Sequence, residues 1–239
     1  MLASISRILR NLAFYAAFYG GSAFFVLAGF PAMLISDRAL QGVAEGWSGW
    51  HRGCARLLLG ITVKLEGELP TENALIAIKH ESFFEAIDTP HLLDHPAVFA
   101  KAELLRIPLW GKVGGTFGLI PVEREQGARA LRKMISIAKA FNKEGRVLVI
   151  FPEGTRIPHG TQGPLQAGFA GLYKLLGIPV VPVALDSGPL YHRRWKRKGT
   201  ITIRVGEPIE PGLPRDEIEA RVTRAINVLN PPADDQASS

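Results

Sequence analysis

The sequence predicts an α/β protein with a mostly parallel sheet and crossover helices, preceded by an N-terminal membrane-associated helical segment. From residue 61 onward, short β-branched runs alternate with stretches of helical spacing, which is the pattern of strands joined by helices. Before residue 61, a long uncharged stretch leads into an amphipathic one. The chain has 239 residues, of which 47% are hydrophobic, and this length suits one α/β domain with an appendage.

The segment Leu12–Ile35 has 24 residues without a charge. As one helix it would extend about 36 Å at roughly 1.5 Å per residue, enough to cross an apolar bilayer core about 30 Å thick. However, Gly20-Gly21 and Pro31 interrupt the segment, and proline inside a helix kinks or ends it. We therefore expect membrane association through a kinked, re-entrant helix pair, with a single span as the alternative. The segment is too long and too aromatic for a cleaved secretory signal.

An amphipathic helix is predicted for Asp37–Gly60, where Trp47 and Trp50 suit the headgroup layer of a membrane. An ordinary surface helix is the alternative interpretation. Three parts are thus expected along the chain. Membrane-anchoring helices occupy residues 1–58, the α/β domain occupies residues 59–229, and residues 230–239 form a disordered tail with no large apolar residue.

Seven strands and four helices are predicted in the α/β domain. The strands are Ile61–Leu65, Ala74–Ile78, Ala97–Ala100, Leu119–Val122, Val147–Phe151, Val180–Leu185 and Ile201–Val205. The helices are Phe83–Leu93, Gly127–Asn142, Gly168–Leu176 and Pro214–Leu229. In such a sheet, reactive side chains collect where strands end and helices begin.

The formal net charge of +6 fits an anionic partner, which could be a phospholipid surface, a phosphorylated substrate or nucleic acid. Cys54 is the only cysteine, which excludes an internal disulfide and a paired-cysteine metal site. The sequence contains no metal-ligand spacing, so we expect neither a metal ion nor a bound cofactor.

His80 directly follows the apolar run Ala74–Ile78 and Lys79, and it precedes a predicted helix. This position places it at the mouth of a strand. An imidazole can act as a general base near neutral pH when a second group fixes its tautomer. Glu85, in the first turn of the following helix, is placed for that task, although a purely structural histidine is the alternative.

Three cations are expected at strand ends. The segment Phe151–Arg156 follows an apolar strand, and its proline and glycine break that strand so that backbone amides and Arg156 can face an anion. Arg124 ends the segment Gly118–Arg124 in the same way, and Lys101 closes the strand before it. Guanidinium groups match phosphate oxygens well. By composition alone, however, Phe151–Arg156 is only a turn.

Together these segments resemble the lysophosphatidic acid acyltransferase (1-acyl-sn-glycerol-3-phosphate acyltransferase) family of glycerolipid acyltransferases. That family has a His-four residues-Asp motif, a glycine-containing segment ending in Arg, the run Phe-Pro-Glu-Gly-Thr-Arg, and an apolar segment with proline. The matching segments, within residues 60–210, are His80–Glu85, Gly118–Arg124, Phe151–Arg156 and Ile178–Val183. The chain departs from the pattern at Glu85, where the family has Asp. Asp88 is an alternative carboxylate, but its spacing from His80 does not match, and we expect it to be a residue of the helix surface.

The resemblance implies a glycerol-3-phosphate acyltransferase-like fold and O-acyl transfer in phospholipid biosynthesis, at the cytoplasmic face of a membrane. His80 would remove the proton from the sn-2 hydroxyl of 1-acyl-glycerol-3-phosphate. That hydroxyl would then attack the thioester of acyl-CoA or acyl-carrier protein and give phosphatidic acid, with Glu85 orienting the imidazole. The implied substrate-binding residues are Lys101, Arg124, Glu153, Gly154, Thr155 and Arg156.

Alternative interpretations of the sequence change either the acceptor or the class of protein. Lyso-ornithine lipid or glycerol-3-phosphate could be the acceptor with the same His80 machinery. A serine hydrolase would need a Gly-x-Ser-x-Gly elbow, which the sequence lacks. The basic run Tyr191–Lys198 could mark a non-catalytic membrane or nucleic-acid binder. We instead expect an interfacial or acyl-carrier-docking loop and no nucleic-acid partner, because anionic lipid attracts each Lys or Arg by about 1 kcal/mol.

Overall fold

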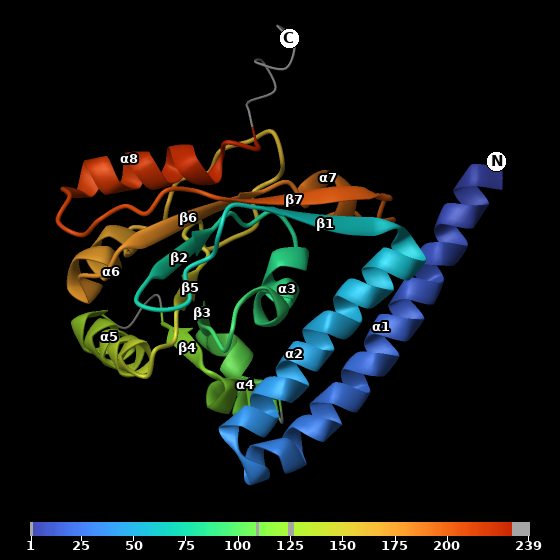
Figure 1. Ribbon diagram of the computed structural model, residues 1–239, viewed down its shortest axis with the longest axis horizontal. Coiled ribbons are helices and arrows are strands. Elements are labelled where there is room, and N and C mark those ends of the chain that lie inside the picture. Colours follow the sequence, from blue (N-terminus) through green and yellow to red (C-terminus); the bar gives the residue numbers. More distant parts are fainter. Residues whose placement is uncertain (1, 109, 124–126, 231–239) are drawn as a thin grey trace, which may run out of the picture.

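The computed structural model describes residues 2–108, 110–123 and 127–230. It has a seven-stranded sheet with helices on both faces and a long helical hairpin beside it (Figure 1). The α/β fold with a mostly parallel sheet, predicted from the sequence, is confirmed. Arg124 and residues 231–239 of the predicted tail lie outside the described residues. Asn230, which was assigned to the same disordered tail, is instead buried, so the prediction is wrong for this residue.

The sheet has the strand order β1-β7-β6-β2-β5-β3-β4, and its strand pairs are parallel except for the antiparallel pair β6–β7. Every residue of β2 and β6 is buried, because strands in the middle of such a sheet are covered on both faces. The strands are β1 (Ile61–Glu66), β2 (Leu75–Ile78), β3 (Ala97–Lys101), β4 (Leu119–Val122), β5 (Leu148–Ile150), β6 (Val180–Leu185) and β7 (Gly199–Val205).

The sheet separates the hydrophobic core into two layers, and helices cover each of them. One face of the sheet packs against α5 (Gly127–Lys143), α6 (Phe169–Leu176) and α8 (Arg215–Ile226). The other face packs against α3 (Phe84–Leu92) and the hairpin (Figure 1). Three short helices were not predicted: η2 (Ala102–Arg106) and α4 (Trp110–Phe117) lie between β3 and β4, and α7 (Gly188–Tyr191) follows β6.

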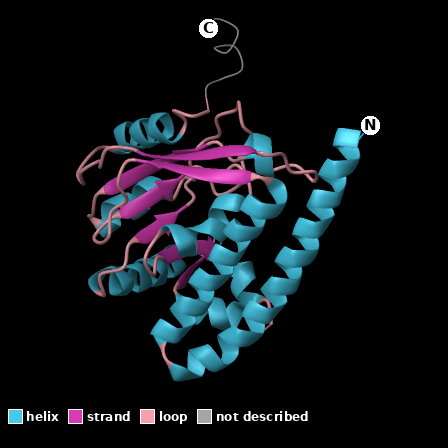
Figure 2. Ribbon diagram, turned by 45° about the vertical axis from the view of Figure 1, so that its right-hand side comes forward, coloured by secondary structure: helices cyan, strands magenta, loops and turns pink. Residues whose placement is uncertain are grey.

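The N-terminal hairpin consists of α1 (Leu2–Ile35), α2 (Asp37–Cys54) and the π-helical turn η1 (Ala55–Leu59). The two long helices lie side by side in both views (Figures 1 and 2). The Ser36 hydroxyl accepts a hydrogen bond from the Ala39 amide at 3.1 Å, which caps the start of α2. The predicted helix pair within residues 12–35 is therefore wrong, since α1 runs through that segment and the chain turns at Ser36.

Gly21 of α1 serves close packing rather than chain reversal. A Cβ on Gly21 would lie 2.1 Å from the indole nitrogen of Trp50, and that nitrogen donates a hydrogen bond to the Ala17 carbonyl at 3.1 Å. Gly21 thus lets α2 approach α1. By length and composition, Ile5–Ile35 could cross a membrane, and much of its surface away from α2 is exposed and apolar.

Arg146 joins three elements at one end of the sheet. Its Nε donates to the His95 carbonyl at 2.9 Å, and its Nη2 donates to the carbonyls of Pro96 at 2.9 Å and Phe117 at 2.6 Å. The guanidinium also lies 4.3 Å from the Phe141 ring centroid. Burial lowers the pKa of Arg146 to about 10, so the group stays charged at neutral pH. It thereby holds the start of β3, the end of α4 and α5 together.

We predict that Arg146→Met lowers the free energy of unfolding by about 2–4 kcal/mol, because three carbonyls, those of Pro96 and Phe117 in buried contacts, lose their donor. The control is Arg215→Met, which removes an exposed ion pair with Glu219 on α8 and should change stability by about 0.5 kcal/mol or less. Thermal unfolding in detergent, followed by circular dichroism, measures both. Equal melting temperatures for the two variants would contradict the structural role of Arg146.

Candidate active site

His80 lies just beyond the end of β2, before α3 begins at Phe84. Its Nδ1 is 2.9 Å from Oε1 of Glu85, and its ring centroid lies 4.6 Å from that of Phe151, with the two rings tilted by 34°. The imidazole lines a large cavity, whereas the Glu85 side chain is buried behind it. The structure therefore brings together the histidine and the carboxylate that the sequence paired.

The Glu85 carboxylate is held by the loop that precedes α3. Its Oε1 accepts hydrogen bonds from the amides of Glu81 and Ser82, both at 2.6 Å. Its Oε2 accepts from the hydroxyls of Ser82 at 3.0 Å and Ser187 at 2.8 Å. An ionised carboxylate can only accept hydrogen bonds, so the proton between it and His80 belongs on Nδ1. That tautomer leaves Nε2 as the basic nitrogen.

Asp88, the alternative carboxylate, has a different partner. Its Oδ1 accepts a hydrogen bond from Nε of Arg52 at 2.8 Å, and Oδ2 pairs with the same guanidinium. The Asp88 side chain is buried, whereas its sequence position suggested a helix-surface residue. Asp88 therefore ties α3 to α2, and the expectation of a surface role is wrong.

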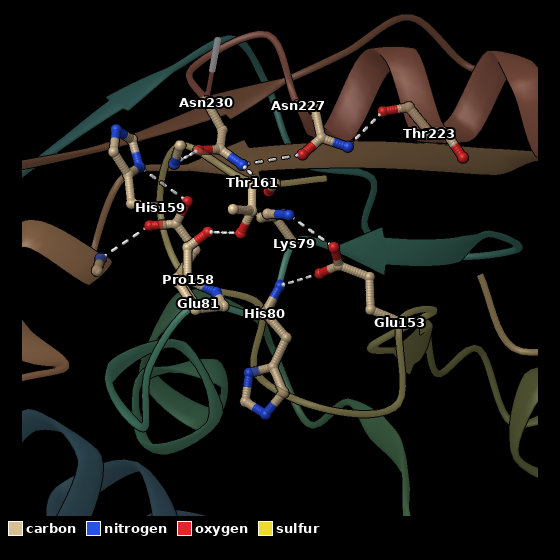
Figure 3. A network of polar contacts seen from close by, with 12 residues as sticks. Lys79, His80, Glu81, Glu153, Pro158, His159, Thr161, Thr223, Asn227 and Asn230 are labelled. Atoms are coloured by element: carbon tan, nitrogen blue, oxygen red, sulfur yellow. Dashed lines mark hydrogen bonds and ion pairs between the residues drawn. The ribbon is translucent and has the colours of Figure 1, made fainter. Parts of the chain in front are cut away.

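Glu153 is turned inward, toward the loop that carries His80. Its Oε1 lies 2.6 Å from Nζ of Lys79, and its Oε2 accepts a hydrogen bond from the His80 amide at 3.0 Å (Figure 3). Both side chains of the Lys79–Glu153 ion pair are fully buried. Figure 3 shows the His80 imidazole pointing away from this pair. Glu153 thus fixes the backbone of His80 and holds the loop after β2 against the loop after β5.

Of the remaining residues predicted for the site, some line the cavity and others lie on the surface outside its lining. Gly154 lines the cavity with a φ of +64°, a left-handed conformation that favours glycine. Lys101, at the end of β3, is exposed and also lines the cavity. Thr155 and Arg156 are exposed, and the guanidinium lies 4.0 Å from the Phe83 ring centroid. Arg124 lies outside the described residues.

A cavity of about 980 Å³ surrounds His80. Most of its wall is apolar and comes from both faces of the sheet, with Phe18 and Trp47 on the hairpin side and Met134 and Phe169 on the α5–α6 side. The cavity therefore reaches around the strand ends where His80 lies. Such a wall accommodates a long hydrocarbon chain rather than a polar ligand.

A second buried carboxylate next to His80 was not identified from the sequence. Glu81 is fully buried and lies 2.9 Å from Nδ1 of His159, and it accepts a hydrogen bond from the Gly188 amide at 2.8 Å. Burial raises the pKa of Glu81, and the contacts with Gly188 and His159 oppose that rise. Asn230 supports the same region by donating to the Thr161 carbonyl at 2.7 Å (Figure 3).

Sequence reasoning missed Lys79, Glu81, Ser82 and Ser187 as parts of the site. Lys79 had a usable signal, because a charged residue directly continues a fully apolar strand. Ser187 had none, because it is 102 positions from Glu85. Among the described residues, no group of three or more His, Cys, Asp or Glu side chains could hold a metal ion.

Comparisons with known proteins agree with this geometry. A family model described as Acyltransferase matches residues 60–186, more than half of the chain. A 1-acyl-sn-glycerol-3-phosphate acyltransferase from Pseudomonas aeruginosa is 29% identical over 236 residues, covering 95% of this chain and 88% of the relative. The 1-acyl-sn-glycerol-3-phosphate acyltransferase alpha from Mus musculus is 27% identical over 175 residues, covering 70% of this chain and 61% of the relative.

The crystal structure of the 1-acyl-sn-glycerophosphate (LPA) acyltransferase PlsC from Thermotoga maritima has the same fold. Its TM-score is 0.72 at 22% identity, and the match covers 99% of this chain and 98% of that one. The family match spans the strands and loops that carry His80, Glu85 and Glu153. The chain therefore belongs to the Acyltransferase family and is an O-acyltransferase.

Proposed function

We propose that this enzyme transfers a fatty acyl group from acyl-CoA or acyl-carrier protein to the sn-2 hydroxyl of 1-acyl-glycerol-3-phosphate. The product would be phosphatidic acid, an intermediate of phospholipid biosynthesis. The observation that carries the proposal is the pair of His80 and buried Glu85 at an apolar cavity. The names of the relatives support the choice of acceptor.

In this mechanism, Nε2 of His80 accepts the proton of the acceptor hydroxyl as its oxygen attacks the thioester carbonyl. The tetrahedral intermediate then expels the thiolate, which takes the proton from the imidazolium. Glu85 is the positioning residue: it holds the proton on Nδ1 and stabilises the positive imidazolium. No acyl-enzyme and no cofactor are needed, because a well-oriented pair of reactants gains about 7–11 kcal/mol over free reactants.

The phosphate of the acceptor would bind to cations beside the cavity. Lys101 is exposed at the end of β3 and Arg156 is exposed in the loop after β5, and Arg124 is assigned to the same phosphate by its motif. Gly154 and Thr155 would shape the approach to the phosphate. We assign Glu153 to positioning His80 rather than to substrate contact, since both of its oxygens already bind Lys79 and the His80 amide.

The membrane is the source of the acceptor in this proposal. Residues of α1 and α2, including Phe25 and Trp47, line the cavity that contains His80. A lipid held between the hairpin and the sheet could therefore reach the base without leaving an apolar environment. A soluble donor requires the site to open at the cytoplasmic face, so we place the catalytic domain there.

We predict that the purified enzyme acylates 1-acyl-glycerol-3-phosphate from a labelled thioester in preference to lyso-ornithine lipid or glycerol-3-phosphate. The His80→Ala variant should lose about 10²–10⁴-fold in turnover because it lacks the general base. Thin-layer chromatography of the labelled products measures both results. Wild-type turnover by His80→Ala, with the fold checked by circular dichroism, would overturn the assignment of the base.

A separate prediction concerns Arg156. Replacement by alanine should raise the KM for the phosphate-bearing acceptor by at least about tenfold with little change in kcat, because a charge-assisted contact is lost. Arg156→Lys should restore only part of the lost apparent affinity for the acceptor, since lysine lacks the bidentate fork. The exposed Arg132→Ala on α5 serves as a matched control. An unchanged acceptor KM for Arg156→Ala would show that its contact with Phe83 is purely structural.

A further inference from the structure

The basic segment 192–198, between α7 and β7, is docked onto the N-terminal half of α1. The Asn11 side chain donates to the Lys196 carbonyl at 3.1 Å and accepts from the Lys196 amide at 2.8 Å. One turn further along α1, the Tyr15 hydroxyl donates to the Arg194 carbonyl at 2.6 Å. These backbone contacts fix the path of the segment and leave its other cations at the surface.

Cations from the hairpin join the same surface. The guanidinium of Arg10 donates to the Leu58 carbonyl at 2.7 Å. A Cβ on Gly60 would lie 3.1 Å from Nη2 of Arg10 and 3.3 Å from Cβ of Lys198, so these two basic side chains are neighbours. We call the exposed cations of this region the basic surface: Arg7, Arg10, Arg56, Arg193, Arg194, Arg197 and Lys198.

Carboxylates of the described part of the chain do not neutralise the basic surface. Among the described residues, none of its seven cations forms an ion pair with a carboxylate, whereas Arg215 and Arg221 on α8 each pair with a glutamate. Neighbouring cations repel one another, so this arrangement is stabilised by an anionic partner. The partner must bind a surface assembled from α1, η1 and a loop whose contacts with α1 join residues 179 and 185 positions apart.

Exposed apolar side chains adjoin these cations. Leu12 is 52% exposed and Leu57 is 80% exposed, and each lies within two residues of a cation of the basic surface. The exposed strip of α1 continues away from the cations through Tyr19, Phe24 and Leu27 to Ile35. Cations beside a long apolar strip match the headgroup and acyl layers of a bilayer, whereas nucleic acid or a soluble acidic protein would leave the strip uncovered.

We propose that the basic surface binds the headgroup phosphates of an anionic phospholipid bilayer and that segment 192–198 makes membrane binding selective for anionic lipid. The apolar strip of α1 supplies binding to any bilayer, and the cations add the dependence on charge. This inference goes beyond the proposed reaction and does not depend on which acceptor is acylated.

The test is co-sedimentation with vesicles of phosphatidylcholine alone or of phosphatidylcholine mixed with phosphatidylglycerol. A variant carrying Arg193→Gln, Arg194→Gln, Arg197→Gln and Lys198→Gln should lose at least about tenfold in affinity for the anionic vesicles. Its binding to phosphatidylcholine vesicles should not change. High salt should reduce wild-type binding to the anionic vesicles to the level of the variant.

Two controls separate this site from net charge. Replacing the three arginines by lysine keeps the charges and should keep anionic binding. The second control carries Arg132→Gln, Lys133→Gln, Lys139→Gln and Lys143→Gln. These four exposed cations lie on α5, on the opposite face of the sheet. The variant loses the same charge elsewhere and should also keep its binding to anionic vesicles. Equal anionic binding by the segment variant and the wild type would overturn the proposal, as would an equal loss in the α5 variant.

One further outcome would assign the surface to a different partner. If the segment variant binds both vesicles normally but loses turnover with acyl-carrier protein as donor in detergent, the basic surface docks an acidic protein and the membrane proposal is wrong. Vesicle binding is measured without turnover, so failure of this proposal is distinguishable from failure of the proposed acyl transfer.

Discussion

The arrangement of the site depends on where the Glu85 carboxylate is held. Five polar groups converge on its two oxygens: Nδ1 of His80, the amides of Glu81 and Ser82, and the hydroxyls of Ser82 and Ser187. A buried carboxylate is stable only when its lone pairs are satisfied, so these bonds fix the loop between β2 and α3. The loop in turn aims the imidazole at the cavity.

The sheet topology explains why distant segments meet at this carboxylate. β2 lies between β5 and β6, and all three strands are parallel, so their carboxyl ends point the same way. The loop after β5 supplies Glu153, which binds Lys79 and the His80 amide. The loop after β6 supplies Ser187. Because β2 lies between two parallel strands, His80, Glu85 and the residues that hydrogen-bond to them all lie at the carboxyl ends of these strands.

The sequence predicted the strands well because each central strand is an uninterrupted apolar run, and it paired His80 with Glu85 because both belong to a local motif. Helix α4 was missed because Gly111 and Gly114 weaken its helical pattern. Their Cβ atoms would lie 2.1 Å from the Leu105 carbonyl oxygen and 2.8 Å from a Leu119 methyl, so packing requires glycine there. Gly21, which suggested a break in α1, likewise makes room for a packed side chain, that of Trp50. Long-range contacts such as Ser187 to Glu85 leave no local trace.

The central claim is that Glu85 holds the proton of neutral His80 on Nδ1, so that Nε2 is the base. Nitrogen-15 NMR of the full-length protein in detergent, with labelled histidine and His80→Ala to assign the signal, tests it directly. The account predicts a protonated Nδ1 and a bare Nε2 in the wild type, with that preference weakened in Glu85→Gln, whose amide keeps the shape but loses the charge. A wild-type His80 with its proton on Nε2 would contradict the account.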